Sequence, residues 1–145
     1  MGARSYSVSR SIGAPATVVW GLLSDASSYA RWNQAVVSIE GDITEGSTIR
    51  LVSIVDPKRT FKLKVAETRA PQHMVWADGM PLGLFKGRRT FTITDRASSG
   101  CEFSMDEAFT GPLAGLITKA IPDLTESFNA FADGLKAAAE SAART

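Results

Sequence analysis

Alternating apolar and polar positions recur along the chain and predict β-strands, because successive side chains of a strand point to opposite faces. Residues 4–12 alternate in this way through Tyr6, Val8 and Ile12. Turn sequences such as "TEGS", "DPKR", "APQ" and "ASSG" separate six further strand-like segments. These segments are residues 36–41, 48–55, 60–69, 73–79, 85–95 and 101–110. The connections are too short for parallel crossovers, so we expect sequential antiparallel hairpins.

Helical spacing replaces this alternation in two regions. In "GAPATVVWGLLSD" Pro15 suits the first turn of a helix, and "ASSYARW" can supply a second short helix that ends near Trp32. From residue 113 to residue 135 apolar side chains recur in steps of three and four, as in a long amphipathic helix. Pro122 must either kink this helix or begin its main part.

The predicted order is one strand, two short helices, six strands and a long C-terminal helix. This order favours an α+β fold in which a seven-stranded curved antiparallel sheet wraps around the C-terminal helix. No repeat, linker or low-complexity tract divides residues 1–145, so we expect a single domain. A curved sheet closed by one helix leaves room for a pocket between them.

One acidic residue interrupts the apolar face of the last predicted strand. In "CEFSMDEAFTG" Phe103, Met105 and Phe109 share a face, and Glu107 lies in phase with them. Centring the preceding turn near Ser98 places Arg89 opposite Glu107. An unpaired buried charge costs several kcal/mol, so an arginine that donates two hydrogen bonds would explain the inward acid. The alternatives are a purely structural salt bridge, or a bulge that turns one partner outward.

The same register brings the loop "DGMPLGLF" beside "GPLAGLI" at the start of the final helix. Both segments carry bulky apolar residues, which suggests an apolar rim around an opening, with glycines that would permit a lid to move. The alternative is that this loop folds down and fills the gap.

Other single residues carry less information. Trp20 is expected in the core, and Trp76 is expected to face inward. His73 is the only histidine and follows "APQ", so a surface turn position is expected for it rather than a catalytic one. One histidine and one cysteine, Cys101, cannot form a usual transition-metal site or an internal disulfide. We therefore expect no metal and no cofactor.

Composition narrows the class of protein further. Apolar residues make up 44% of the chain and charged residues 21%, as in ordinary soluble globular proteins. The formal net charge of +1 gives no electrostatic reason to expect nucleic acid as a partner. No apolar run approaches the roughly 20 residues that span a bilayer, and no signal-peptide core is evident, so we expect a cytoplasmic protein without membrane insertion.

Four segments of the sequence, together with the order of elements, resemble the SRPBCC superfamily, also called START-like, whose members have the helix-grip fold. The segments are "SIGAPATVVWGLLSDASSYARWNQAV", "KVAETRAPQHMVW", "GLFKGRRTFTIT" and "EAFTGPLAGLI". The resemblance is greatest to small bacterial proteins of the polyketide cyclase/dehydrase or lipid-transport type. It implies an internal cavity more firmly than any reaction.

Three functional hypotheses follow. The first is binding of a hydrophobic or amphipathic small molecule, such as a lipid, an isoprenoid or a polyketide-like compound. The second is a cofactor-independent cyclase, aromatase or dehydratase that uses the same cavity, with Glu107 and Arg89 as candidate catalytic residues. The third and weakest is a protein-interaction module. The sequence leaves open whether the protein is a monomer or a dimer. The residues expected to line the pocket are Trp32, Leu51, Leu63, Val65, Trp76, Phe85, Arg89, Phe91, Met105, Glu107, Leu113, Ile117, Ile121, Leu124 and Phe128.

Overall fold

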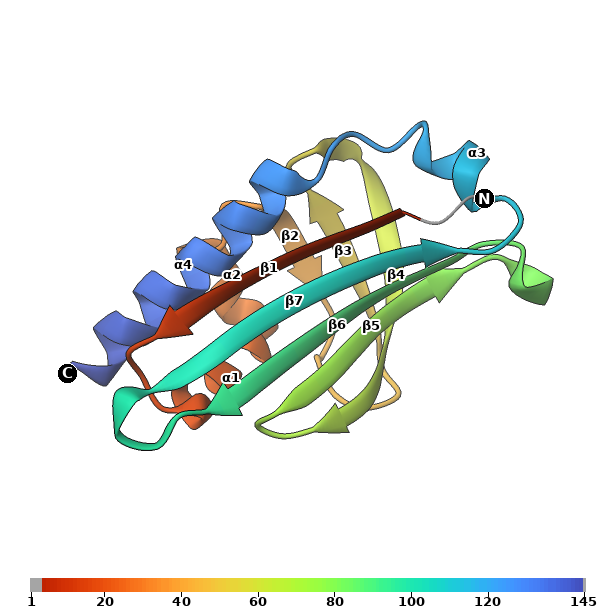
Figure 1. Ribbon diagram of the computed structural model, residues 1–145. Helices are drawn as coiled ribbons and strands as arrows, with labels where there is room; N and C mark the ends of the chain where they lie inside the picture. Colours follow the sequence, from red (N-terminus) through yellow and green to blue (C-terminus); the bar gives the residue numbers. More distant parts are fainter. Residues whose placement is uncertain (1–3, 145) are drawn as a thin grey trace.

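The computed structural model describes residues 4–144, without the side chain at position 98 (Figure 1). Residues 1–3 and 145, which the single-domain prediction included, lie outside that range. Seven strands form one antiparallel sheet in the order β1-β7-β6-β5-β4-β3-β2. Their bounds are β1 Arg4–Ile12, β2 Val36–Glu40, β3 Thr48–Ser53, β4 Asp56–Arg69, β5 His73–Gly79, β6 Lys86–Asp95 and β7 Cys101–Thr110.

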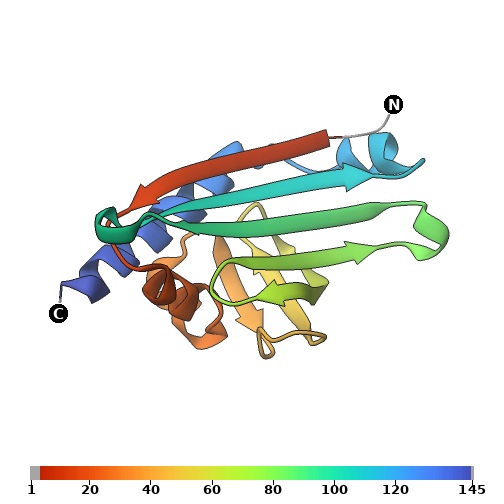
Figure 2. The same ribbon diagram turned by 60° about the horizontal axis from the view of Figure 1, so that its bottom comes forward.

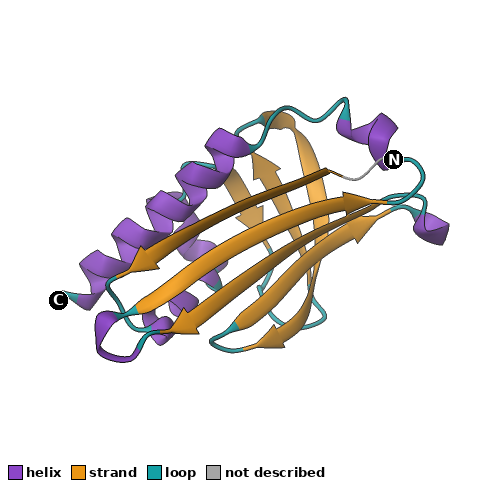
Figure 3. Ribbon diagram, in the orientation of Figure 1, coloured by secondary structure: helices purple, strands orange, loops and turns teal. Residues whose placement is uncertain are grey.

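The helices lie in the connections and at the C-terminal end of the chain. Helix α1 (Ala16–Leu23), the 3-10 turn η1 (Ala26–Ser28) and α2 (Tyr29–Trp32) connect β1 to β2. Two further 3-10 turns, η2 (Pro81–Gly83) and η3 (Ala97–Ser99), join β5 to β6 and β6 to β7. Helices α3 (Ala114–Thr118) and α4 (Thr125–Ala143) follow the sheet. The sheet curves, and α4 lies across its concave side (Figures 2 and 3). This is the predicted helix-grip fold.

Two predicted boundaries were wrong, and prolines occur at both. The sequence "DPKR" is not a turn: the chain turns at residues 54–55, and Asp56 already pairs with Ser53. The C-terminal helix is neither kinked at Pro122 nor started by it. Pro122 lies in a non-helical linker between α3 and α4, since proline lacks the N–H and the space that a helix interior requires. The Thr125 N–H at the start of α4 donates to Asp123 instead (2.8 Å).

Aromatic side chains fill much of the space between sheet and helices. The Trp32 ring packs on Tyr29 and Phe131, with centroids 4.7 and 5.6 Å away, and Trp76 packs on Phe91 at 4.7 Å. The Tyr29 hydroxyl donates to the Leu23 carbonyl oxygen at 2.5 Å, and burial raises its pKa well above the usual range, so the phenol stays neutral. This cluster packs α2 and α4 against β5 and β6. Trp76 faces inward, as predicted, whereas Trp20 is only partly buried.

Polar contacts hold α4 along β1. The Arg10 guanidinium donates to Asp133 at 2.7 Å and to Asn129 at 2.8 Å. Further along the helix, the Glu140 carboxylate accepts from the Gly13 N–H at 2.8 Å. These contacts fix the helix against the sheet edge, so that its apolar face points into the concave side.

Helix α4 lies in close contact with the C-terminal end of α2 at Gly134. A Cβ at this position would overlap the carbonyl oxygen of Trp32, whereas Gly21 in α1 has open space around it. We predict that Gly134→Ala lowers the free energy of unfolding by about 1–3 kcal/mol because of overpacking. Gly21→Ala, the matched control, should raise it by about 0.5–1 kcal/mol through helix propensity. Urea titration of both variants checks the prediction, and equal effects would contradict it.

Candidate functional site

The register of three neighbouring strands places the candidate residues in one row on the concave face. Trp76 of β5 lies opposite Arg89 of β6, and Arg89 lies opposite Glu107 of β7. The predicted hairpin register is therefore confirmed, together with the opposition of Phe91 to Met105 and of Ile93 to Phe103. No bulge interrupts β6 and β7 between these pairs. Glu107 consequently points inward, although it lies on a strand of otherwise apolar inward residues.

Arg89 and Glu107 form a short ion pair. The Nε and Nη2 atoms of Arg89 donate to the same oxygen, Oε1 of Glu107, at 2.7 and 2.6 Å. The two side chains are only 18% and 15% exposed, so the pair is largely removed from water. Because Oε1 accepts both hydrogen bonds, the second oxygen of Glu107 has no hydrogen-bond partner among the described residues. That oxygen can accept a hydrogen bond from a ligand.

Aromatic rings of α4 cover the other side of the guanidinium. The Arg89 Cζ atom lies 4.9 Å from the centroid of Phe128 and 5.9 Å from that of Phe131. Such cation–π contacts stabilise a desolvated arginine by about 0.5–2 kcal/mol each. Arg89 thus connects the sheet to the helix, in addition to facing the cavity.

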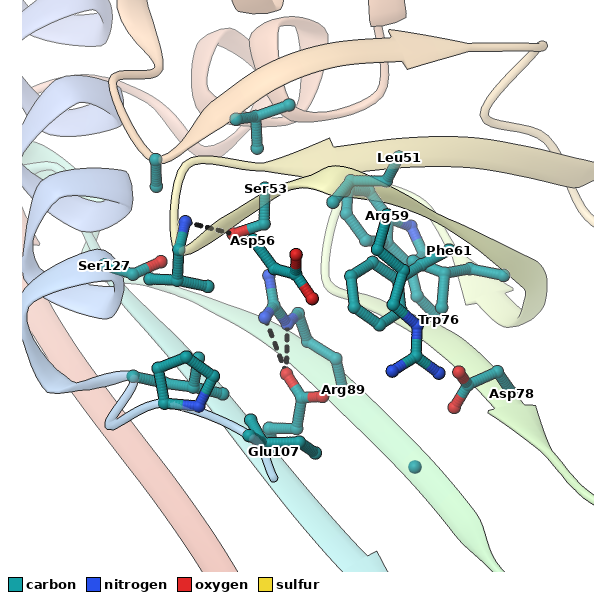
Figure 4. A pocket seen from close by; sticks show the side chains of 18 of the residues that line it. Leu51, Ser53, Asp56, Arg59, Phe61, Trp76, Asp78, Arg89, Glu107 and Ser127 are labelled. Carbon is teal, nitrogen blue, oxygen red and sulfur yellow. Dashed lines mark hydrogen bonds and ion pairs between the residues drawn. The ribbon is translucent and has the colours of Figure 1, made fainter. Parts of the chain in front are cut away.

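A cavity of about 100 Å³ opens beside this pair (Figure 4). The larger apolar residues of its wall include Leu51, Phe61, Leu63, Trp76, Phe109 and Leu124. The β3–β4 turn at Val55 and the linker residues Ala120 to Pro122 also line it. A cavity of 150 Å³ is known to hold benzene, so this smaller, open hollow holds at most one small ring, or the end of a chain that continues through the opening.

A second row of inward positions adds a carboxyl to the cavity. Asp78 of β5 lies opposite Gly87 of β6, which lies opposite Phe109 of β7. A Cβ at Gly87 would be 2.6 Å from Oδ1 of Asp78, so the absence of a side chain there makes room for the carboxyl. Burial raises the pKa of Asp78, and the charge of Glu107 raises it further, whereas Arg59 and the Gly87 N–H act in the opposite direction.

The first residues of β4 contribute two more charged groups. Arg59 and Asp56 both border the cavity, and neither forms an ion pair within the described part of the chain. Arg59 is exposed and lies over the ring of Phe61, with its Cζ 4.7 Å from the centroid. Figure 4 shows Arg59 and Asp78 on the same side of the cavity. The wall is thus apolar with five charged groups, not with the single pair that the sequence indicated.

The sequence analysis did not identify Arg59 or Asp78 as cavity residues, although the alternation along their strands indicates that both face inward. Arg59 is in phase with Phe61 and Leu63, but the interpretation of "DPKR" as a turn removed it from the strand. Asp78 is in phase with Trp76, but both faces of that strand carry apolar residues, so its inward face was ambiguous. Ser53 and Ser127 also line the cavity, and no sequence signal marked them.

The residues expected to line the pocket divide into two groups. Seven of them border the cavity: Leu51, Leu63, Trp76, Arg89, Glu107, Ile121 and Leu124. The other eight lie outside its lining, and most are packed in the core: Trp32, Val65, Phe85, Phe91, Met105, Leu113, Ile117 and Phe128. Core packing explains the difference, because an inward phase does not distinguish a residue beside a hollow from one beneath neighbouring side chains.

The loop "DGMPLGLF" lies beside the segment "GPLAGLI", as predicted, but the apolar residues expected to form a rim there do not border this cavity. The Leu113 N–H donates to the Leu84 carbonyl oxygen at 2.9 Å, which joins the loop to the start of α3. Leu82 in the loop is 96% exposed and Leu116 in α3 is 69% exposed, whereas Phe85 at the end of the loop is buried against Phe109, so the loop reaches the core through Phe85 only. The observed opening lies between the linker before α4 and the β3–β4 turn.

His73 begins β5 outside the cavity, and its Nε2 lies 3.7 Å from a carboxylate oxygen of Glu67. No cluster of three potential metal-ligating side chains occurs in the described part of the chain, residues 4–144. Within it, no helix has both the length and the apolar character needed to cross a membrane.

Residues 3–140 match the family described as "Polyketide cyclase / dehydrase and lipid transport", so the chain belongs to that family. A search of curated proteins found no match. The Zhui aromatase/cyclase from Streptomyces sp. R1128 is similar in structure, with a TM-score of 0.73, 15% identity, and coverage of 95% of this chain and 94% of that one.

Two further solved structures have the same fold. A START superfamily protein from Mycobacterium smegmatis has a TM-score of 0.65 and 16% identity, with 97% of this chain and 98% of that chain covered. A protein of unknown function from Staphylococcus aureus has a TM-score of 0.70 and 11% identity, with 99% and 97% covered. At these identities the similarity establishes the fold alone.

Removing the positive charge of the buried pair tests its energetic role. We predict that Arg89→Met lowers the free energy of unfolding by about 2–3 kcal/mol, because Glu107 is left as a partly buried charge without a partner. Adding Glu107→Gln should recover part of that loss, which gives a coupling energy of about 1–2 kcal/mol in a double-mutant cycle.

The control is the exposed pair Arg96–Glu102 at the turn of the same hairpin, with side chains 55% and 32% exposed. Its coupling energy should be below about 1 kcal/mol. Equal coupling in the two cycles, measured by denaturant unfolding, would show that the inward pair is as hydrated as the outer one.

Proposed function

We propose that the protein binds an amphipathic small molecule in the cavity beside Arg89 and Glu107. The observation that carries this proposal is a hollow with an apolar wall and a few convergent polar groups, which is the usual composition of a ligand site. The apolar part of the ligand would contact Leu51, Leu63 and Trp76. Its polar part would meet the remaining N–H groups of Arg89 and the second oxygen of Glu107.

The size of the cavity limits the ligand. About 100 Å³ suits one ring of a polyketide-like or isoprenoid compound, or the polar end of a lipid whose chain extends through the opening. Drug-sized ligands usually occupy about 300–1,000 Å³. A larger ligand therefore requires movement of the linker at Ala120–Pro122, which separates α3 from α4 and borders the opening.

Filling the cavity tests the proposal. Ser127 of α4 lines the cavity, and Ser141 lies exposed on the same helix. Binding of para-cresol, geraniol and decanoic acid is measured by calorimetry and by the rise in Tm, since a ligand specific for the folded state stabilises it. We expect at least one probe to bind the wild type, Ser127→Trp to weaken that binding at least about tenfold, and Ser141→Trp to leave it unchanged.

Native mass spectrometry of the freshly purified protein complements these titrations by identifying any molecule that it carries. Failure of all three probes, together with a bare-chain mass, would contradict the proposal. Equal binding by the wild type and Ser127→Trp would place the ligand elsewhere on the protein.

A cyclase, aromatase or dehydratase reaction in the same cavity is the second candidate. The observation in its favour is that two carboxyls, Glu107 and Asp78, border one hollow in different surroundings, as acid–base catalysis requires. Loss of turnover of a poly-β-ketone thioester in Glu107→Gln, with binding retained, would support the enzyme. Binding without turnover in the wild type would support the carrier.

A further inference from the structure

Asp78, like Asp56, is a cavity carboxyl that forms no ion pair with an arginine within the described chain. Its side chain is partly buried and lies over the backbone of Gly87, where a Cβ would come within 2.6 Å of Oδ1. The carboxyl therefore occupies space that the sheet leaves open, on the inner wall of the cavity. Such a position suits contact with a bound molecule.

The charges around the cavity disfavour an anionic ligand. Facing Asp78 are Asp56 and Arg59 on β4, Arg89 on β6 and Glu107 on β7, and no charged residue of α4 or of the preceding linker lines the cavity. Three carboxyls thus meet two guanidiniums, and Glu107 already binds two N–H groups of Arg89. A carboxylate ligand would add a fourth negative group to a partly desolvated space.

We propose that Asp78 binds the ligand as a carboxylic acid, donating its proton in a hydrogen bond to an uncharged carbonyl, phenol or alcohol oxygen. This inference rests on the proposed function and names the ligand class more narrowly, as a neutral, oxygen-bearing compound of about one ring. Where Asp78 is ionised in the free protein, the proton comes from solvent when the ligand displaces water from the carboxyl, so binding at those pH values is coupled to uptake of one proton. Burial and the charge of Glu107, which raise the pKa of Asp78, support this coupling.

The sign of the pH dependence follows from the direction of this shift. A ligand that requires the protonated acid binds with full affinity below the pKa of Asp78 in the free protein, and it loses affinity as the pH rises from that pKa toward the higher pKa of the complex. The stability of the folded protein without ligand should also fall as the pH rises. Because its pKa is raised on folding, Asp78 lowers stability as the pH rises from the unfolded pKa through the folded one.

Three probes of nearly equal shape separate the possibilities: para-cresol, which is neutral, para-toluate, which is anionic, and toluene, which has no oxygen. We expect wild-type affinity for para-cresol to be at least about threefold higher near pH 5 than near pH 8. Toluene should bind more weakly and show no pH dependence. Para-toluate should bind more weakly than para-cresol near pH 8, where it is fully ionised.

Substitutions test whether the pH dependence of para-cresol binding comes from Asp78. Asp78→Asn retains a hydrogen-bond donor and should bind para-cresol with no pH dependence, at an affinity near that of the wild type at the acidic end. Without ligand, this variant should be more stable than the wild type near pH 8 and equally stable near pH 4. The controls are Asp106→Asn, on the exposed outer face of β7, and His73→Gln, which removes the only histidine. Both should retain the wild-type pH profile.

The possible outcomes separate three claims: the role of Asp78, the neutral ligand class and the proposed binding function. Binding of para-cresol with the same affinity at both pH values, or a pH dependence that persists in Asp78→Asn, would overturn the role of Asp78 and leave the proposed function standing. Tighter binding of para-toluate than of para-cresol would overturn the neutral ligand class. Failure of all three probes to bind at either pH would overturn the proposed function for ring-sized ligands and this inference with it.

Discussion

The pairing register of β5, β6 and β7 is the constraint on which the candidate site depends. Side chains alternate between faces with period two, so a slip of one residue would turn Arg89, Glu107 and Asp78 toward solvent. The apolar inward residues of β7 oppose that slip, because Phe103, Met105 and Phe109 would leave the core together. Hydrophobic burial thus fixes the position of the charges, and the charges then define the chemistry of the hollow.

Aromatic packing beneath α4 and the break in the helical path at Pro122 explain why the hollow lies at one end of the concave face. Trp32, Trp76 and Phe131 occupy the inner part of the space beneath α4, where Gly134 allows close contact with α2. Toward the other end, the helical path breaks at Pro122, and the linker spans the gap without helical side-chain packing. Arg89 stands at the boundary between these regions, with its guanidinium held between Glu107 and the rings of α4.

Local pattern was sufficient to predict all seven strands, their antiparallel pairing and the partner of Glu107, because each depends on alternation and short turns. It was insufficient for the outline of the cavity. Whether Phe91 or Leu63 borders empty space depends on the volumes of side chains from distant strands and from α4, which no single segment encodes. Arg59 and Asp78 show the other limit, since each was in phase with inward residues but lay where the strand boundary or the inward face was misjudged.

A shared fold leaves the chemistry of the hollow open, because the wall and not the framework recognises a ligand. In this chain the wall combines a ring-sized volume with three carboxyls and two guanidiniums. An apolar chain alone would leave these groups desolvated and without new partners, at a cost of about 1–3 kcal/mol for each hydrogen bond not replaced. A compound with its own oxygen atoms offsets that cost. The proposed ligand is therefore a compact, polar-headed compound and not a pure hydrocarbon.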